Sequence, residues 1–233
     1  MPIGTAKIGD SESTEAAQAA SRSRLYWLLG KCFEFPSAPV YDWLVGGEFG
    51  AGFKESLGTI SFALLPAADR VLRGAAAAGE IGHAEFQAAY IRLFELGKGG
   101  RPPCPLYEGE HAGDAKMTVM EDLVRCYKYF GFGLQQGREF ELPDHLSVQL
   151  EFMHCLALME AHVLQQQLDP VPYRKAQREF LQRHLSGWLA TLKNKVAAHE
   201  PPPFFDAVID LLREYVALDA QHLDALIAKP AGD

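Results

Sequence analysis

Glu151 and His154 form a Glu-x-x-His pair within a strongly helical stretch and have the residue types of a metal site. Residues three positions apart share one face of a helix. Helical di-iron proteins use such pairs, but they also need a second Glu-x-x-His and two further inward-pointing glutamates. The other matches to this pattern fall at a glycine-flanked helix boundary and in a Pro/Gly-rich loop. We therefore assign no metal ligands and keep a di-iron-like oxidoreductase using Glu151 and His154 as the alternative hypothesis.

Patterns for other kinds of catalysis are missing from the sequence. It contains no G-x-S-x-G nucleophile elbow, and Gly97-Lys98 lacks the upstream glycine and the following Ser/Thr of a phosphate-binding loop. A zinc site or a redox dithiol would need closely spaced cysteines. The cysteines stand far apart, at Cys32, Cys104, Cys126 and Cys155. The sequence predicts neither catalytic residues nor a bound cofactor.

Charged and ring-bearing residues gather in two loops. Tyr107 and Glu108 lie in the stretch 97–114, whose glycines and prolines stop any helix or strand. Long loops in compact chains are often functional, and side chains at their ends stay accessible. A surface loop alone also explains Glu108.

The second loop, 134–142, leads into the string Glu141-Leu142-Pro143-Asp144-His145. Pro143 suits the first turn of a helix, and Asp144 places negative charge near a helix N-terminus, where the helix dipole favours it. A plain helix cap is therefore sufficient to explain Asp144.

These loops separate segments in which apolar residues recur at helical spacing. Leu25, Leu28, Leu29 and Cys32 are one example. Strand-like alternation between hairpin turns is missing. The sequence predicts an all-α bundle of about eight to ten helices. We expect short helices in 37–60 and longer ones over 61–78, 82–96, 115–130, 143–168, 172–199 and 204–228.

Composition narrows the classes of function. With 48% hydrophobic residues the chain can form a substantial core. Its net charge of -8 and the lack of a basic stripe argue against nucleic acid as a partner. No run approaches the about 18–20 apolar residues of a membrane span, and the N-terminus lacks a signal-peptide layout. We expect a cytoplasmic protein that binds another polypeptide and is not an enzyme.

Taken in order, the motifs resemble a known family. They are Pro105-Leu106-Tyr107-Glu108, the aromatic helix end Tyr127 to Phe132, and Glu141-Leu142-Pro143-Asp144-His145 followed by Glu151-Phe152-Met153. This pattern is similar to the TorD/DmsD/NarJ family of redox-enzyme maturation chaperones. The branch that it resembles most serves type II enzymes of the dimethyl-sulfoxide-reductase family, such as ethylbenzene dehydrogenase, dimethylsulfide dehydrogenase, and selenate or chlorate reductase.

The resemblance implies an N-terminal and a C-terminal helical subdomain joined by a hinge. We place a disordered tail at 1–12, the subdomains at 13–133 and 143–228, and the hinge linker at 134–142. It also implies a monomer or homodimer that binds the catalytic subunit of a molybdopterin oxidoreductase, its twin-arginine signal peptide, or both, during cofactor insertion and before export.

Carried over residue by residue, the resemblance places client binding at Glu141, Pro143, Asp144 and His145, with Tyr107 and Glu108 as neighbours. A twin-arginine leader carries two arginines and then an apolar run. Its binder needs carboxylates beside an apolar groove, and Glu108, Glu141 and Asp144 can supply the carboxylates.

Overall fold

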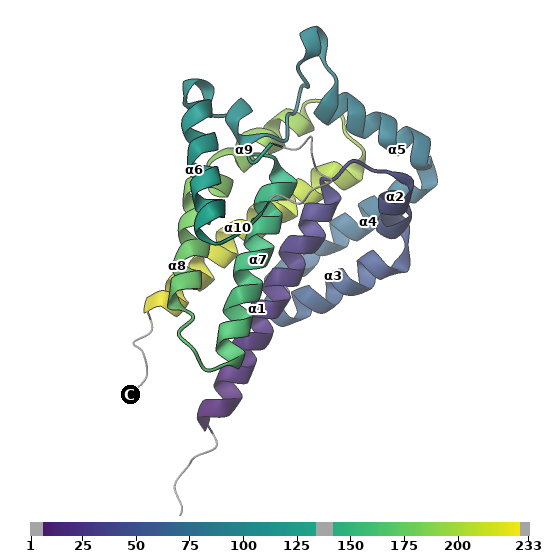
Figure 1. The fold of residues 1–233 in the computed structure, drawn as a ribbon. Coiled ribbons are helices and arrows are strands. Elements are labelled where there is room, and N and C mark those ends of the chain that lie inside the picture. The colour runs from purple at the N-terminus through teal and green to yellow at the C-terminus, as the bar shows by residue number, and fades with distance from the viewer. Residues whose placement is uncertain (1–6, 134–141, 229–233) are drawn as a thin grey trace, which may run out of the picture.

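The structure is a computed structural model that describes residues 7–133 and 142–228. Figure 1 shows a helical bundle. Its helices are α1 (Lys7–Cys32), α2 (Ala38–Val45), α3 (Gly47–Ile60), α4 (Leu65–Ile81), α5 (His83–Tyr90), α6 (Lys116–Tyr129), α7 (Leu146–Gln165), α8 (Val171–Phe180), α9 (Ser186–Ala197) and α10 (Pro203–Ala228). Two π-helical segments, η2 (Ile91–Glu95) and η6 (Leu181–Leu185), extend α5 and α8. Within the described ranges the only β pairing is one isolated bridge, so the all-α prediction is confirmed.

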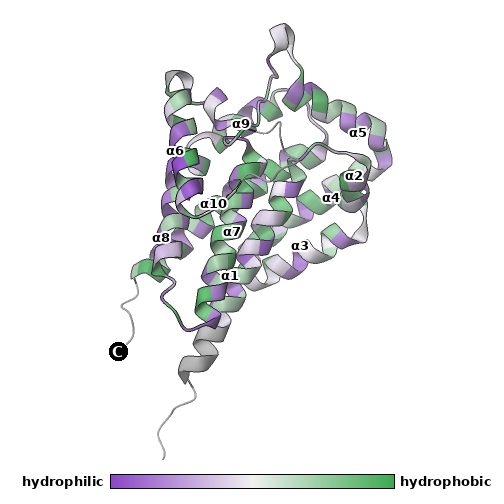
Figure 2. Cartoon of the chain, viewed as in Figure 1, coloured by the Kyte–Doolittle hydropathy of each residue, from purple (hydrophilic) through white to green (hydrophobic). Residues whose placement is uncertain are grey.

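Helices α1 and α7 run side by side through the middle of the bundle (Figure 1). Helices α2 to α5 cover one side of this pair, and α6 and α8 cover the other. Helix α10 packs on α4, α8 and α9. Helices α7 and α10 carry mostly hydrophobic residues (Figure 2), as expected for helices with neighbours on several sides. None of the helices in the described parts has the length and apolarity that a bilayer span requires.

The apolar core is continuous across the expected boundary between subdomains. One cluster of buried residues includes Leu29 and Phe53 from the first half of the chain and Phe152 and Phe205 from the second. The division at 134–142 therefore stays a prediction, and most of that linker lies outside the described residues. The expected tail at 1–12 is wrong in its second half, because α1 begins at Lys7. Extending an existing helix over polar residues costs little once the helix has nucleated.

A buried arginine connects helices α1, α7, α8 and α10. Arg22 is only 1% exposed. Its Nε donates to Asp219 Oδ1 at 2.6 Å, and its Nη1 donates to Glu160 Oε2 at 2.8 Å. Its Nη2 donates to Gln177, while the Tyr26 hydroxyl donates to the other oxygen of Asp219. Because every charged atom has a partner, the guanidinium can stay ionised in the core.

Electrostatics agrees with this geometry. Burial alone would lower the pKa of Arg22, but the carboxylates of Asp219 and Glu160 outweigh burial and hold that pKa above its ordinary value. Glu160 is shared with a second arginine, since Arg174 Nε donates to its Oε1 at 2.7 Å. Burial alone would raise the pKa of Glu160, yet Arg22 and Arg174 hold it below its ordinary value. Arg22 and Glu160 therefore both favour their charged forms inside the bundle.

Replacing Arg22 by methionine should lower the free energy of unfolding by about 3–5 kcal/mol, because Asp219 would be left buried without its cation. Urea denaturation followed by circular dichroism measures this change. Arg24→Met is the matched control on the same helix. Arg24 pairs with Glu55 at the surface, where both side chains are more than half exposed, so its loss should cost less than about 1 kcal/mol. Equal effects of the two substitutions would contradict a special role for the buried network.

Candidate functional site

The structure brings the two predicted loops together. Tyr107 and His145 form the isolated antiparallel bridge, and their rings meet edge to face with centroids 4.9 Å apart. The Glu108 N–H donates to the carbonyl of Asp144 at 3.0 Å. Four of the predicted site residues therefore form one constellation, although Glu108 and Asp144 are 36 positions apart in sequence (144 − 108).

Their carboxylates point into the protein. Asp144 is 0% exposed and Glu108 is 6% exposed. The Glu108 carboxylate accepts from Gln149 Nε2 at 2.7 Å and lies 3.2 Å from His184 Nδ1. Asp144 Oδ2 accepts the N–H of Gly109 at 3.0 Å. A side chain at Gly109 would approach that same oxygen to 2.8 Å, so the close contact requires glycine.

The start of α7 also differs from expectation. The helix begins at Leu146, and its N-cap is His145, whose side chain accepts the N–H of Ser147. Pro143 precedes the helix instead of standing in its first turn, and its carbonyl accepts from the Tyr127 hydroxyl at 2.8 Å. The Pro143-Asp144-His145 string therefore makes three contacts. Pro143 binds α6, Asp144 binds the loop that contains Glu108, and His145 caps α7.

The expectation that these side chains are accessible is wrong for Glu108, Asp144 and His145, all of which are buried. Tyr107 and Pro143 are half-buried, and Glu141 lies outside the described residues. Loop position suggested exposure, but each carboxylate accepts at least one hydrogen bond inside the fold, which offsets part of the cost of burying it. A direct role of these residues in client binding stays a prediction.

Asp144 is an unusual buried carboxyl group. Burial raises its pKa above the ordinary value of 3.8, and the hydrogen bond from Gly109 offsets only part of this rise. Its Oδ1 atom and Gln149 Oε1 are both buried, and neither has a hydrogen-bond partner among the residues that the structure describes. Burial therefore favours the neutral form of Asp144 more than solvent does for an exposed aspartate.

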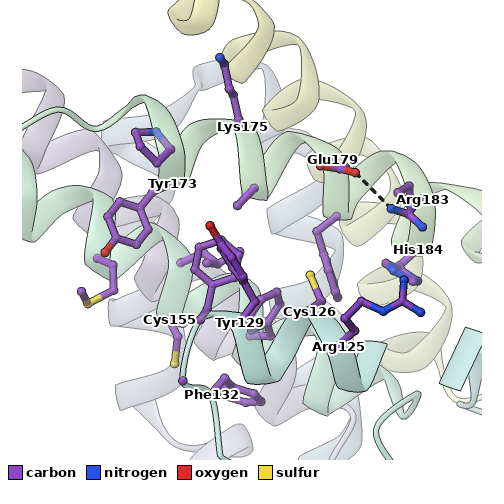
Figure 3. Close-up of a pocket in the computed structure, with 18 of the residues that line it drawn as sticks. Arg125, Cys126, Tyr129, Phe132, Cys155, Tyr173, Lys175, Glu179, Arg183 and His184 are labelled. Carbon is purple, nitrogen blue, oxygen red and sulfur yellow. Dashed lines mark hydrogen bonds and ion pairs between the residues drawn. The ribbon is translucent and has the colours of Figure 1, made fainter. Parts of the chain in front are cut away.

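An open groove lies between α6, α7 and α8, close to this constellation (Figure 3). Its volume is about 1130 Å³. Apolar lining comes from Tyr129, Phe130, Phe132, Met159 and Tyr173. Tyr129 is 82% exposed and Met159 is 41% exposed. Such aromatic and methionine side chains suit an irregular apolar ligand, because they offer large contact area and adapt to its shape.

Charged side chains gather toward one end of the groove, while Tyr173 and Cys155 lie toward the other (Figure 3). Arg183 donates through Nη2 to Asp122 Oδ2 at 2.5 Å and through Nη1 to Glu179 Oε1 at 3.1 Å. The buried His184 also approaches this carboxylate, since its Nε2 lies 3.4 Å from the same Oδ2. The second ring nitrogen of His184 faces Glu108. One histidine therefore connects the groove with the buried loop.

The two members of the Glu-x-x-His pair serve different neighbours. His154 Nδ1 lies 2.8 Å from the hydroxyl of Ser23 on α1, whereas Glu151 lines the groove. No group of three or more His, Cys, Asp or Glu side chains in the described ranges is arranged to hold a metal ion. The geometry gives the di-iron hypothesis no ligand set among these residues.

Sequence reasoning missed the groove and its charged end. The sequence motifs singled out none of Asp122, Arg183 and His184 as site residues. The aromatic helix end around Tyr129 and Phe130 was the available signal, because several large rings at a helix terminus rarely all find room in a core.

A family model described as the nitrate reductase delta subunit matches residues 50–194, more than half of the chain. The chain belongs to the nitrate reductase delta subunit family. The groove and the Tyr107–His145 bridge are built from residues that lie largely within this matched region. Membership confirms the resemblance to the NarJ/TorD group that the Pro-Leu-Tyr-Glu and Pro-Asp-His motifs indicated.

Several named chaperone proteins have sequences similar to this chain. The chlorate reductase assembly chaperone protein of Ideonella dechloratans is 37% identical over 121 residues, which are 52% of this chain and 62% of that protein. The selenate reductase assembly chaperone protein of Thauera selenatis is 36% identical over 117 residues, 50% of this chain and 60% of that protein. The chaperone protein TorD of Shewanella loihica is 32% identical over 149 residues, 59% and 62% of the two chains. The matches thus span 60–62% of the length of these relatives.

Two substitutions at Asp144 should separate its hydrogen bond from its charge. Asp144→Asn keeps an acceptor for the Gly109 N–H and removes a buried carboxyl group, so the free energy of unfolding should be unchanged or higher. Asp144→Ala leaves the Gly109 N–H without its acceptor and should cost about 1–3 kcal/mol. Urea denaturation of both variants measures the difference. If asparagine is as damaging as alanine, the fold needs the charge itself.

The raised pKa of Asp144 has a consequence for pH dependence. A carboxyl group whose pKa is higher in the folded protein contributes stability that is complete below pH 3.8 and is lost as pH rises through the folded-state pKa. The wild type should therefore lose free energy of unfolding relative to Asp144→Asn as pH is raised from 3.8 toward neutral. Denaturation curves of both proteins across this range measure the effect. A difference that does not change with pH would contradict the assignment.

Proposed function

We propose that this protein is a chaperone dedicated to the assembly of one molybdenum-containing oxidoreductase. In this proposal it binds the catalytic subunit of that enzyme during cofactor insertion and has no catalytic activity of its own. The relatives named for chlorate reductase and selenate reductase support the class of client. The observation that carries the proposal is the groove between α6, α7 and α8, because it offers a family member an open apolar site for a polypeptide.

The size and lining of the groove favour a peptide segment over a small molecule. Pockets for small ligands usually have volumes of about 300–1,000 Å³ and enclose most of the ligand. The groove has a volume of about 1130 Å³ and is partly open to solvent. Amphipathic segments bind such grooves with their apolar face against the protein. Exposed aromatic anchors such as Tyr129 supply much of the energy in interfaces of this kind.

The distribution of charge supports the twin-arginine leader as the bound segment. Such a leader presents arginines beside an apolar run, and the groove presents Asp122 and Glu179 beside Tyr129 and Met159. In this proposal Asp122 and Glu179 bind the leader arginines, the role that the sequence had suggested for Glu108 and Asp144. Those two side chains are buried. Binding a flexible segment requires ordering it, which offsets much of the contact energy and allows release.

Two further features belong to the proposal. Holding the client before export requires a chaperone in the cytoplasm. The protein works as a monomer or a homodimer, because the groove is formed within one chain and needs no second copy. The competing hypothesis of a metal-dependent oxidoreductase finds no comparable support, since His154 is engaged with Ser23.

Co-expression with the catalytic subunits of the molybdenum oxidoreductases of the same organism tests the proposal. The tagged wild type should retain one of these subunits in a pull-down. Tyr129→Ala should weaken retention roughly tenfold, because truncating a central aromatic anchor commonly costs about 1–2 kcal/mol. Titration with purified client measures the change in affinity.

Met117→Ala is the matched control. Met117 lies on the same helix and is 69% exposed, but it does not line the groove. Its truncation should leave retention unchanged. Failure of the wild type to retain the catalytic subunit would overturn the proposed function, and equal losses in both variants would overturn the groove as its site.

A further inference from the structure

The charged end of the groove already holds an arginine of the chain itself. Arg183 binds Asp122 and Glu179 through its two terminal nitrogens. We propose that Arg183 occupies, in the free protein, the position that an arginine of the client segment takes in the complex. A client segment then binds by displacing Arg183 from Asp122, and the groove prefers arginine because a guanidinium replaces a guanidinium. This inference rests on the proposed function and assigns a specificity-determining residue to the same site.

The carboxylate of Asp122 is the fixed partner in this arrangement. Its side chain is only 19% exposed, and His184 Nε2 lies 3.4 Å from Oδ2 on the buried side. His184 is itself 5% exposed and faces Glu108 with its other nitrogen. A carboxylate supported from behind in this way keeps its orientation when its outer partner changes. Asp122 is therefore a preorganised acceptor for a cation in the groove.

The guanidinium of Arg183 is the replaceable partner. Its side chain is 52% exposed, and that of Glu179 is 65% exposed. Ion pairs at such positions contribute only about 0–1 kcal/mol, because solvent screens the charges and long side chains lose rotamer freedom. Arg125 is a weaker competitor, since its Nη1 lies 3.9 Å from Asp122 Oδ1 and its side chain is 76% exposed. Exchange of Arg183 for another guanidinium costs little.

The spacing of the two acceptors favours arginine over lysine. One guanidinium reaches Asp122 with Nη2 and Glu179 with Nη1 at the same time. A planar fork with separate donors can bridge two carboxylates in this way, whereas an ammonium group acts as a compact point charge. The two acceptors are thus separated by the width of one guanidinium.

The local backbone explains why the adjacent residues Arg183 and His184 contact Asp122 from the surface and from the interior. Arg183 and His184 lie in the π-helical segment η6, and π segments inside α-helices are frequent at functional sites. Figure 3 shows Arg183 on the Glu179 side of the groove with His184 next to it. His184 and Leu185 are buried, while Arg183 remains at the surface. The segment therefore supplies both the inner support of Asp122 and its outer partner.

Fluorescence anisotropy with labelled synthetic peptides tests the inference. The probe carries two arginines followed by a leucine-rich run, and matched probes carry two lysines or two glutamines instead. Arg183→Gln should tighten binding of the arginine probe by about two- to fivefold, the range that loss of a surface ion pair represents. It should leave the glutamine probe unchanged. Asp122→Asn should abolish the preference for arginine, and adding Arg183→Gln to it should change nothing further.

Arg178→Gln is the control for loss of an arginine. Arg178 pairs with Asp224 of α10 and is not part of the groove lining, so binding of every probe should stay at the wild-type level. If Asp122→Asn does not fold, Glu179→Gln at the exposed second acceptor provides the same comparison. Suppose that the wild type retains the catalytic subunit but Arg183→Gln binds the arginine probe no more tightly than the wild type does. This result would overturn the inference about Arg183 and leave the proposed function standing. Loss of that retention in the wild type overturns the proposed function as well.

Discussion

The bundle depends on the need to neutralise one buried cation. Arg22 lies inside α1, and its partners come from α7, α8 and α10. An unpaired guanidinium in the core would cost many kcal/mol, so the helices are stable together only in an arrangement that brings these partners to it. Apolar packing alone tolerates sliding and rotation of helices, whereas directed hydrogen bonds do not. The position of α8, one wall of the groove, follows from this requirement through Gln177.

A second polar network links the loop at Glu108 to the groove. Glu108 receives hydrogen bonds in the interior from Gln149 of α7 and faces His184 of η6, which in turn faces Asp122 of α6. Each of the three elements that form the groove therefore contributes to one chain of polar contacts. The motif residues that first suggested a binding site hold its walls in place. In the proposed function, these residues act on a client indirectly, through the position of Asp122.

The sequence predicted the helices well because their signals are local. The spacing of apolar residues predicted the bounds of α7 and α10 to within a few residues. The glycines and prolines around Tyr107 correctly predicted a segment without long helices there. The burial of Asp144 could not be predicted, because it depends on the N–H of Gly109, a residue distant in sequence that meets it only in the folded chain. The groove was equally hidden, since the exposure of Tyr129 depends on which neighbours α7 and α8 leave uncovered. Resemblance identified the family correctly, but it led to an expectation of accessible side chains at positions that are buried.

The bridge between Tyr107 and His145 closes a long excursion of the chain that contains α6. Closing such a loop has an entropic cost that depends only weakly on its length. The excursion can therefore gain or lose residues in evolution while its base stays the same. Because α6 supplies Asp122 and Tyr129 from within this closed loop, one wall of the groove can change in length and sequence while the contacts at the base of the loop stay the same.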